Sequence, residues 1–275
     1  MKSDASAARE IYDAVREEGE RELDRPLRSL FWSAATAGVL MSLSVVVSAL
    51  LAKAAGHDHP ARTLIVALGY PSGFLLVMLG HMQLFTENTI TTVLPVLERK
   101  SASCLRRSAL LWGVVLGANV LGAGAAAAAL VFGMMPAEVV PAMVDVAREA
   151  TSGSFGGVFA AAIPAGFVIA VLVWVTRLQR QRVLLIALFT WVIAAAHFKH
   201  VIVGSVEMFV LLFTDGLSAL SLVLTFFLPA LAGNVVGGTL MFALMAWAQV
   251  SEESKDADDG QKRGSTGTEP ASAQG

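Results

Sequence analysis

The region between residues 27 and 250 consists of long apolar runs joined by short polar segments. Each run is close to the roughly 20 residues with which a helix crosses a bilayer. The pattern therefore predicts an all-α polytopic membrane protein with six transmembrane helices. The predicted spans cover approximately 30–51, 63–97, 108–132, 156–175, 184–213 and 217–248.

Polar segments flank the membrane domain, which we expect to cover residues 29–250. In residues 1–28, Ile11 and Val15 recur among charged residues at helical spacing. This pattern predicts an amphipathic helix on the membrane or on the cytoplasmic face of the protein. A solvated helix without a function of its own is the alternative. Residues 251–275 contain almost no apolar side chain, which is typical of a disordered cytoplasmic tail.

The second and the fifth predicted spans are each interrupted by polar residues. The interruptions lie at 81–89 and at 200–205, and the second directly follows Lys199. A lysine near the centre of a spanning helix costs roughly 2.5 to 3.5 kcal/mol on insertion scales, so such residues usually face a wet cavity or a partner. Irregular backbone at that depth is tolerated only where it is buried in protein or lines a cavity. We therefore predict two broken helices that share one site.

An internal repeat relates the two halves of the domain. The run Asn119-Val-Leu-Gly-Ala in the third span matches Asn234-Val-Val-Gly-Gly in the sixth, and the same offset places Thr86 on Val201. With three spans in each half, the second copy enters the membrane from the opposite side. Paired interruptions in such inverted repeats indicate a permeation site near the bilayer midplane. The predicted architecture is aquaporin-like.

The composition and the charge distribution agree with a membrane protein. Hydrophobic residues make up 55% of the chain and charged residues 15%, and the mean hydropathy is +0.65. Sixteen of the 20 lysine and arginine residues lie in the two terminal segments and in the loops after the second and fourth spans, against three in the other loops. This bias predicts that both termini are cytoplasmic.

Other classes of function find little in the sequence. The net charge of −2 and the lack of a basic face do not indicate nucleic-acid binding. The single cysteine, Cys104, and the lack of a cysteine and histidine cluster do not indicate a metal site, and we expect no cofactor. An enzyme would need a nucleophile with a base, for which only Ser205 near His200 is available. We therefore do not expect an enzyme.

Three features together resemble the formate/nitrite transporter family over roughly residues 27–250. They are the run Gly80-His-Met-Gln-Leu-Phe-Thr, the asparagine and glycine elements of the third and sixth spans, and the histidine at the second interruption. The resemblance implies a homopentamer in the bacterial inner (plasma) membrane. Each protomer would have its own pore for small monovalent anions such as formate or nitrite.

The resemblance also implies roles for four residues. Thr86 would be the pore threonine of the family, and His200 would be its central pore histidine. Leu84 and Phe85 would form a hydrophobic constriction.

One departure from the family pattern concerns the charge at the pore centre. The family usually has Glu-His followed by an asparagine four residues after the histidine, whereas this chain has Lys199-His200 and Gly204. The departure resembles the YfdC-like branch, in which lysine replaces the glutamate. We expect Lys199 to attract an anion past the constriction, while His200 and Thr86 donate hydrogen bonds to it. Proton transfer from His200 or Lys199 would let the anion leave as a neutral weak acid.

Other interpretations of these ionisable residues stay open. His200 could serve only as a hydrogen-bond partner between helices. Lys199 could form a static ion pair with Glu87 or Glu207 that locks the two broken helices together. The protein could also be a non-conducting membrane sensor or scaffold whose pore is plugged by Lys199.

Four further residues are expected to support the site. Asn119 and Asn234 are predicted to secure the broken helices rather than bind solute. His197 is expected to be structural or adjacent to the pore, and Glu87 to support the first interruption.

Overall fold

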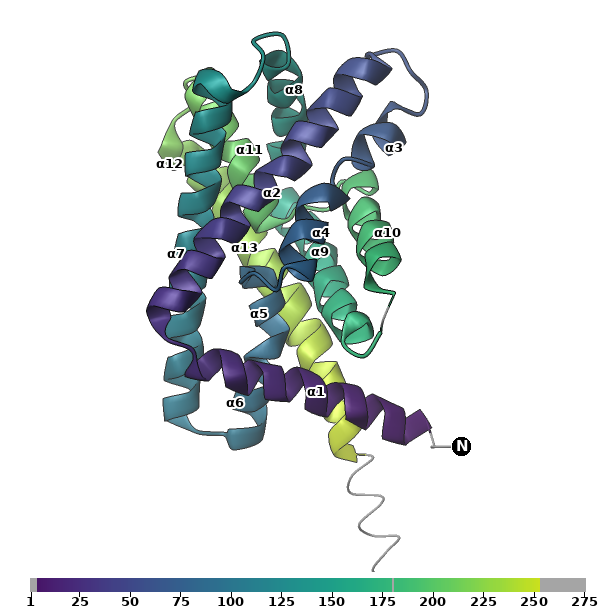
Figure 1. The fold of residues 1–275 in the computed structure, drawn as a ribbon, viewed down its shortest axis with the longest axis vertical. Coiled ribbons are helices and arrows are strands. Elements are labelled where there is room, and N and C mark those ends of the chain that lie inside the picture. Colours follow the sequence, from purple (N-terminus) through teal and green to yellow (C-terminus); the bar gives the residue numbers. More distant parts are fainter. Residues whose placement is uncertain (1–3, 180, 253–275) are drawn as a thin grey trace, which may run out of the picture.

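The structure, a computed structural model, describes residues 4–179 and 181–252, and every regular element in those ranges is a helix (Figure 1). The first half contains α1 (Asp4–Asp24), α2 (Leu27–Ala55), α3 (Arg62–Ala67), α4 (Pro71–Leu79), α5 (Phe85–Thr91), α6 (Val93–Arg99), α7 (Ala102–Ala129) and the π-helical η1 (Leu130–Met134). The second half contains α8 (Val140–Thr151), α9 (Phe155–Thr176), α10 (Arg182–Ala195), α11 (Val201–Thr214), α12 (Ala219–Leu222), η2 (Val223–Phe227), α13 (Leu228–Val235) and η3 (Val236–Ala243).

Five helical stretches in the described residues are long and apolar enough to cross a membrane. They are Leu27–Ala55, Arg62–Leu79, Ala102–Met134, Phe155–Thr176 and Ala219–Glu252. The fifth predicted span is divided into α10 and α11, which have 14 residues each. The all-helical, apolar character of the domain is thus confirmed, and the count of six spans stays a prediction.

Small residues let the long helices approach closely. A Cβ atom on Gly38 of α2 would lie 2.1 Å from the carbonyl oxygen of Asn119, and one on Gly122 of α7 would lie 2.1 Å from that of Ala35. No side chain therefore fits between α2 and α7 at this level. This contact is the close packing that glycine and alanine allow between membrane helices.

Two segments, 80–84 and 196–200, break the helical geometry inside the bundle. His81 (φ 50°) and His197 (φ 55°) adopt left-handed conformations and follow the ends of α4 and α10. Leu84 and His200 are extended and precede α5 and α11. The two breaks therefore have the same backbone plan, a left-handed histidine followed three residues later by an extended residue.

The predicted limits of the two interruptions, 81–89 and 200–205, are wrong at their C-terminal ends. Residues 85–89 and 201–205 are helical, because their polar side chains bond within their own helices instead of unwinding them. The Thr89 hydroxyl donates to the Thr86 carbonyl at 2.7 Å, and the Ser205 hydroxyl donates to the Val201 carbonyl at 2.7 Å. A polar residue in an apolar run thus marks the region of a break without marking its end.

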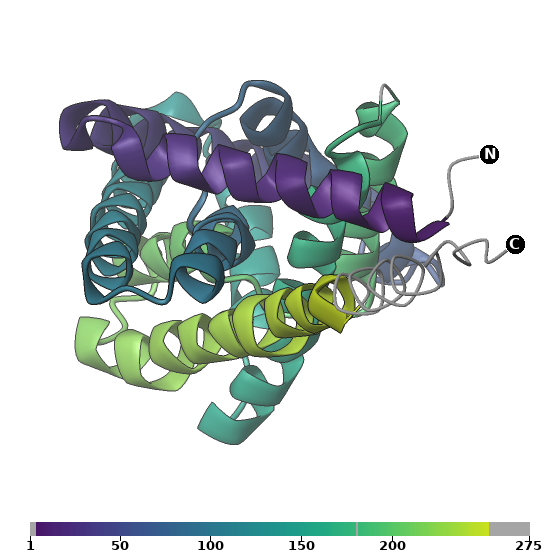
Figure 2. The same cartoon turned by 90° about the horizontal axis from the view of Figure 1, so that it is seen from below.

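The helices α1 and α8 cover opposite ends of the bundle (Figure 1). The helix α1 runs across one end (Figure 2), and its Tyr12 and Val15 are buried against Ile90 and Leu94 of α5 and α6. The helix α8 lies at the other end, as expected for a short helix between the third and fourth spans. The predicted tail lies outside the described residues, apart from the helical Ser251 and Glu252.

Candidate pore site

Each break is held by one buried asparagine. Asn119 accepts a hydrogen bond from the Phe85 amide at 3.0 Å and donates to the carbonyl oxygens of Ala34 and Gln83 at 2.7 and 2.9 Å. Because the amide group provides one acceptor and two donors, it satisfies backbone groups that the break leaves without helical partners. Asn119 is thus the anchor of the first break.

Asn234 repeats this arrangement at the second break. It accepts from the Val201 amide at 2.8 Å and donates to the carbonyl oxygens of Ala162 and Lys199, each at 2.8 Å. Val201 therefore corresponds to Phe85, and the expected correspondence of Val201 with Thr86 is wrong by one residue. The same alignment places Lys199 on Gln83.

The glycine that follows each asparagine by three residues makes matching contacts. A Cβ atom on Gly122 would meet the carbonyl oxygen of Ala35 at 2.1 Å, and one on Gly237 would meet that of Ile163 at 2.0 Å. Each of these carbonyls belongs to the residue after the one that the neighbouring asparagine bonds, Ala34 and Ala162. The matching pentapeptides therefore have matching partners in the structure.

Thr86 and His200 meet where α5 and α11 begin. The Thr86 Oγ1 atom lies 2.9 Å from His200 Nε2, and both residues are buried. His200 Nδ1 accepts a hydrogen bond from the Val203 amide at 3.4 Å, so a neutral ring carries its proton on Nε2 and donates it to Thr86. The hydroxyl proton of Thr86 is then available to a further acceptor.

Two cavities open on either side of this contact. We call the first the α1-side cavity; it is lined by residues that include Glu18, Gln83, Leu84 and Glu87. We call the second the α8-side cavity. Its lining residues include Arg62, Glu149, His197, Lys199, His200 and Glu207.

The predicted constriction residues separate in the structure. Leu84 is fully buried and lines the α1-side cavity. Phe85 packs edge-on against Trp112 of α7, with ring centroids 5.5 Å apart, and is not among the lining residues of either cavity. The aromatic ring beside His200 belongs to Phe74, with centroids 5.0 Å apart. Phe74 carried no signal in the sequence, because a phenylalanine in an apolar span is most often a packing residue.

Lys199 reaches from the second break towards α8. Its Nζ atom donates to the carbonyl oxygen of Glu149 at 3.1 Å. Among the described residues, no ion pair joins Lys199 to Glu87 or Glu207, although Glu207 lines the same cavity. His197 is half exposed, and its Nδ1 atom lies 3.5 Å from the Glu149 carboxylate. The structure thus brings Lys199, His197 and His200 to one cavity.

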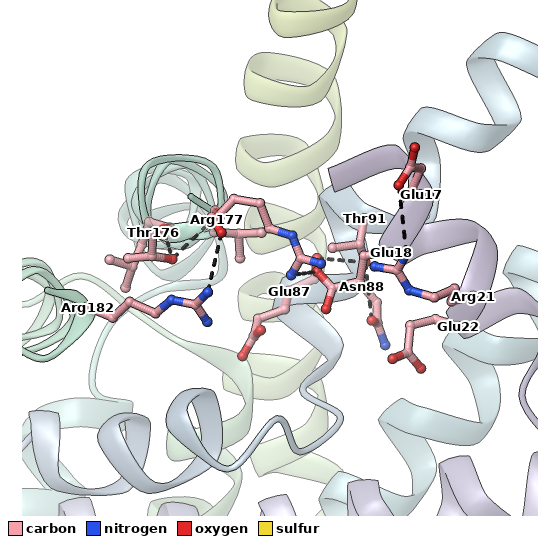
Figure 3. Close-up of polar contacts among 12 residues, drawn as sticks. Glu17, Glu18, Arg21, Glu22, Glu87, Asn88, Thr91, Thr176, Arg177 and Arg182 are labelled. Carbon is pink, nitrogen blue, oxygen red and sulfur yellow. Dashed lines mark hydrogen bonds and ion pairs between the residues drawn. The ribbon is translucent and has the colours of Figure 1, made fainter. Parts of the chain in front are cut away.

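Glu87 faces the other cavity. Its Oε1 atom is buried and has no hydrogen-bond partner among the described residues. Figure 3 shows the polar groups around this cavity, with Glu18 and Glu22 from α1 and with Arg177 and Arg182 near the ends of α9 and α10. Arg177 forms an ion pair with Glu18, which ties α1 to the bundle at the rim of the cavity.

Gly204 has a structural explanation. A Cβ atom at this position would lie 2.2 Å from Cζ of Phe226, which is buried and lines the α8-side cavity. Phe226 therefore occupies the space next to Gly204 that an asparagine side chain would need.

The broken helices, their paired asparagines and the two cavities define a helical, membrane-channel-like fold. The described residues contain no group of three or more metal-binding side chains. Comparisons with known proteins give the family. The sequence profile described as formate/nitrite transporter matches residues 9–248. The chain belongs to the formate/nitrite transporter family.

Individual relatives agree with this assignment. The chain is 38% identical to the "Inner membrane protein YfdC" of Escherichia coli (strain K12), over 90% of this chain and 80% of that protein. It is 25% identical to the "Uncharacterized transporter YrhG" of Bacillus subtilis (strain 168), over 86% of this chain and 90% of that protein.

Solved structures share the fold. A structure titled "FNT family ion channel" has a TM-score of 0.75 at 17% identity and covers 87% of this chain and 98% of that chain. A "Pentameric formate channel with formate bound" has a TM-score of 0.66 at 18% identity and covers 81% of this chain and 96% of that chain.

Proposed function

We propose that the protein is a membrane channel or transporter for small monovalent anions such as formate or nitrite. The family assignment supports the solute class, and the buried Thr86–His200 contact between two polar cavities carries the proposal for this chain. The N-terminal ends of α5 and α11 meet at this contact, and helix N-termini favour negative charge. Thr86 donates its hydroxyl proton to the passing anion, because His200 already donates to the oxygen of that hydroxyl.

The described conformation is closed at this contact. Thr86 is fully buried and lines neither cavity, while Leu84 lines one cavity and His200 the other. An anion therefore reaches Thr86 when Leu84 or the Phe74 ring moves aside. Phe85 packs against Trp112 and acts in this proposal by holding the break rather than by narrowing the path.

Lys199 provides positive charge on the α8 side of the contact in this proposal. Its position corresponds to Gln83 on the α1 side, so the two halves of the path differ in charge. The 38% identity to YfdC supports placing the chain in the branch with lysine before the central histidine. Proton transfer to the anion, which would release it as a neutral acid, remains part of the proposal.

The arrangement in the membrane is proposed on the same grounds. Six spans form two inverted three-helix repeats, supported by the matching contacts of Asn119 and Asn234. The distribution of lysine and arginine supports cytoplasmic termini, α1 included. The homopentamer and the location in a bacterial inner membrane rest on what the structural neighbour and the Escherichia coli relative are named for.

Flux in proteoliposomes tests the function. Vesicles with the wild-type protein should take up formate and nitrite faster than empty vesicles, and both Lys199→Gln and His200→Asn should reduce the rate. A net current carried by the anion indicates a channel, whereas flux without current indicates cotransport with a proton. Unchanged flux in both variants would refute the site. Wild-type vesicles with no flux at any pH would favour the plugged sensor or scaffold instead.

A further inference from the structure

Glu149, near the C-terminal end of α8, is the meeting point of three cationic or titratable side chains. Its carboxylate lies 3.7 Å from Arg62 Nη1 and 3.5 Å from His197 Nδ1. Its carbonyl oxygen accepts the hydrogen bond from Lys199 Nζ. All four residues line the α8-side cavity, which also reaches His200. A carboxylate group therefore already occupies the cluster formed by Arg62, His197 and Lys199.

Arg62 is the part of this cluster that lacks a satisfactory partner. Its side chain is only 19% exposed, and its Nε atom is buried without a hydrogen-bond partner among the described residues. Leaving a buried donor unsatisfied costs about 1 to 3 kcal/mol, and more for a charged group. The separation of 3.7 Å from Glu149 is longer than a hydrogen bond. Guanidinium groups bind planar carboxylates through two parallel hydrogen bonds, and Glu149 does not provide this geometry.

We propose that Arg62, His197 and Lys199 form an anion-binding site in the α8-side cavity that takes small planar carboxylates, and that the Glu149 carboxylate is its tethered occupant. An external carboxylate displaces the Glu149 side chain and satisfies the Arg62 fork. The inference rests on the proposed anion transport for its biological sense, since this cavity would then hold the solute before it reaches His200.

The contacts of Glu149 are weak enough for this exchange. The side chains of Glu149 and His197 are 46% and 50% exposed. Ion pairs that are this accessible to solvent contribute about 0 to 1 kcal/mol. Displacement of the tethered carboxylate therefore reduces the affinity for an external anion by at most a small factor. Glu207, which lines the same cavity, keeps the site from holding an anion too tightly for passage.

Binding of formate to the purified full-length protein tests the site without requiring transport. Saturation-transfer NMR of the formate C–H proton, followed as a titration, suits a weak ligand. Removing the competitor with Glu149→Gln should tighten formate binding about fivefold, which corresponds to about 1 kcal/mol. Glu138→Gln, which neutralises an exposed carboxylate just before α8, is the matched control and should leave binding unchanged.

The Arg62 variants complete the test. Arg62→Gln in the Glu149→Gln background should abolish the gain. Arg62→Lys, which keeps the charge and loses the fork, should retain only part of it and guards against loss of folding. Equal binding by Glu149→Gln and Glu138→Gln, or full binding by Arg62→Gln, would overturn the proposal. This binding pattern in a protein that transports no anion would count against the proposed function alone, and transport without this pattern would count against the site alone.

Discussion

The prediction that depends most directly on the geometry of the breaks concerns Asn234. Replacing it with alanine removes three hydrogen bonds of 2.8 Å each, to the Val201 amide and to the carbonyl oxygens of Ala162 and Lys199. A typical hydrogen bond contributes about 0.5 to 1.5 kcal/mol, so the three together contribute about 3 kcal/mol. Buried backbone groups left without partners would increase the loss. We expect Asn234→Ala to lower the free energy of unfolding by about 3 kcal/mol or more.

The measurement is unfolding of the detergent-solubilised protein by sodium dodecyl sulfate, followed by circular dichroism. Asn119→Ala should give a loss of similar size, because its side chain makes the same set of three bonds. Thr225→Ala is the control, since this exposed hydroxyl bonds only to the Ser221 carbonyl of its own helical stretch. Its effect should stay within about 0.5 kcal/mol. A loss below about 1 kcal/mol for Asn234→Ala would refute the role of this side chain as the anchor of the break.

Two further predictions concern other parts of the chain. Gly204→Asn should destabilise the protein in a melting experiment through the clash with Phe226, and Phe226→Ala in the same chain should recover part of the loss; equal melting of Gly204→Asn and wild type would contradict the contact. Burial raises the pKa of Glu22 in α1 above its usual value despite the nearby Arg25. Because a raised pKa in the folded state means that stability is lost as the pH rises above the usual carboxyl range, Glu22→Gln should melt higher than wild type at neutral pH and the difference should vanish near pH 4. A difference that persists at pH 4 would contradict this assignment.

Sequence patterns predicted the parts of the site that depend on local polarity. A polar residue in a long apolar run is expensive, so Thr86, His200 and Lys199 identified the region of the breaks. The repeated asparagines identified the anchors, because a buried amide needs three partners and the breaks provide them. The exact limits of the breaks depend on which backbone groups the asparagines bond. That choice is made by packing and left the alignment of the two halves wrong by one residue.

The residues that the sequence did not identify act through contacts between distant segments. Arg62 and Glu149 lie in polar connections where a charged residue is ordinary, and only the fold brings them together beside Lys199. Phe85 was expected at the constriction, but its ring packs against Trp112, and Phe74 contacts His200 instead. Apolar side chains carry no sign of which face they present, so these placements needed the structure.

Flux through proteoliposomes that carry Thr86→Val is the most direct test of the account. Valine has nearly the shape of threonine and lacks the hydroxyl that accepts from His200 and donates to the anion. A hydrogen bond to a charged group contributes about 1.5 to 3 kcal/mol, so formate flux should fall about 10- to 100-fold. Thr190→Val is the control, because the buried Thr190 hydroxyl bonds carbonyls of its own helix, with its shorter contact to Ile186. A Thr86→Val protein that conducts formate as fast as Thr190→Val would contradict the central claim.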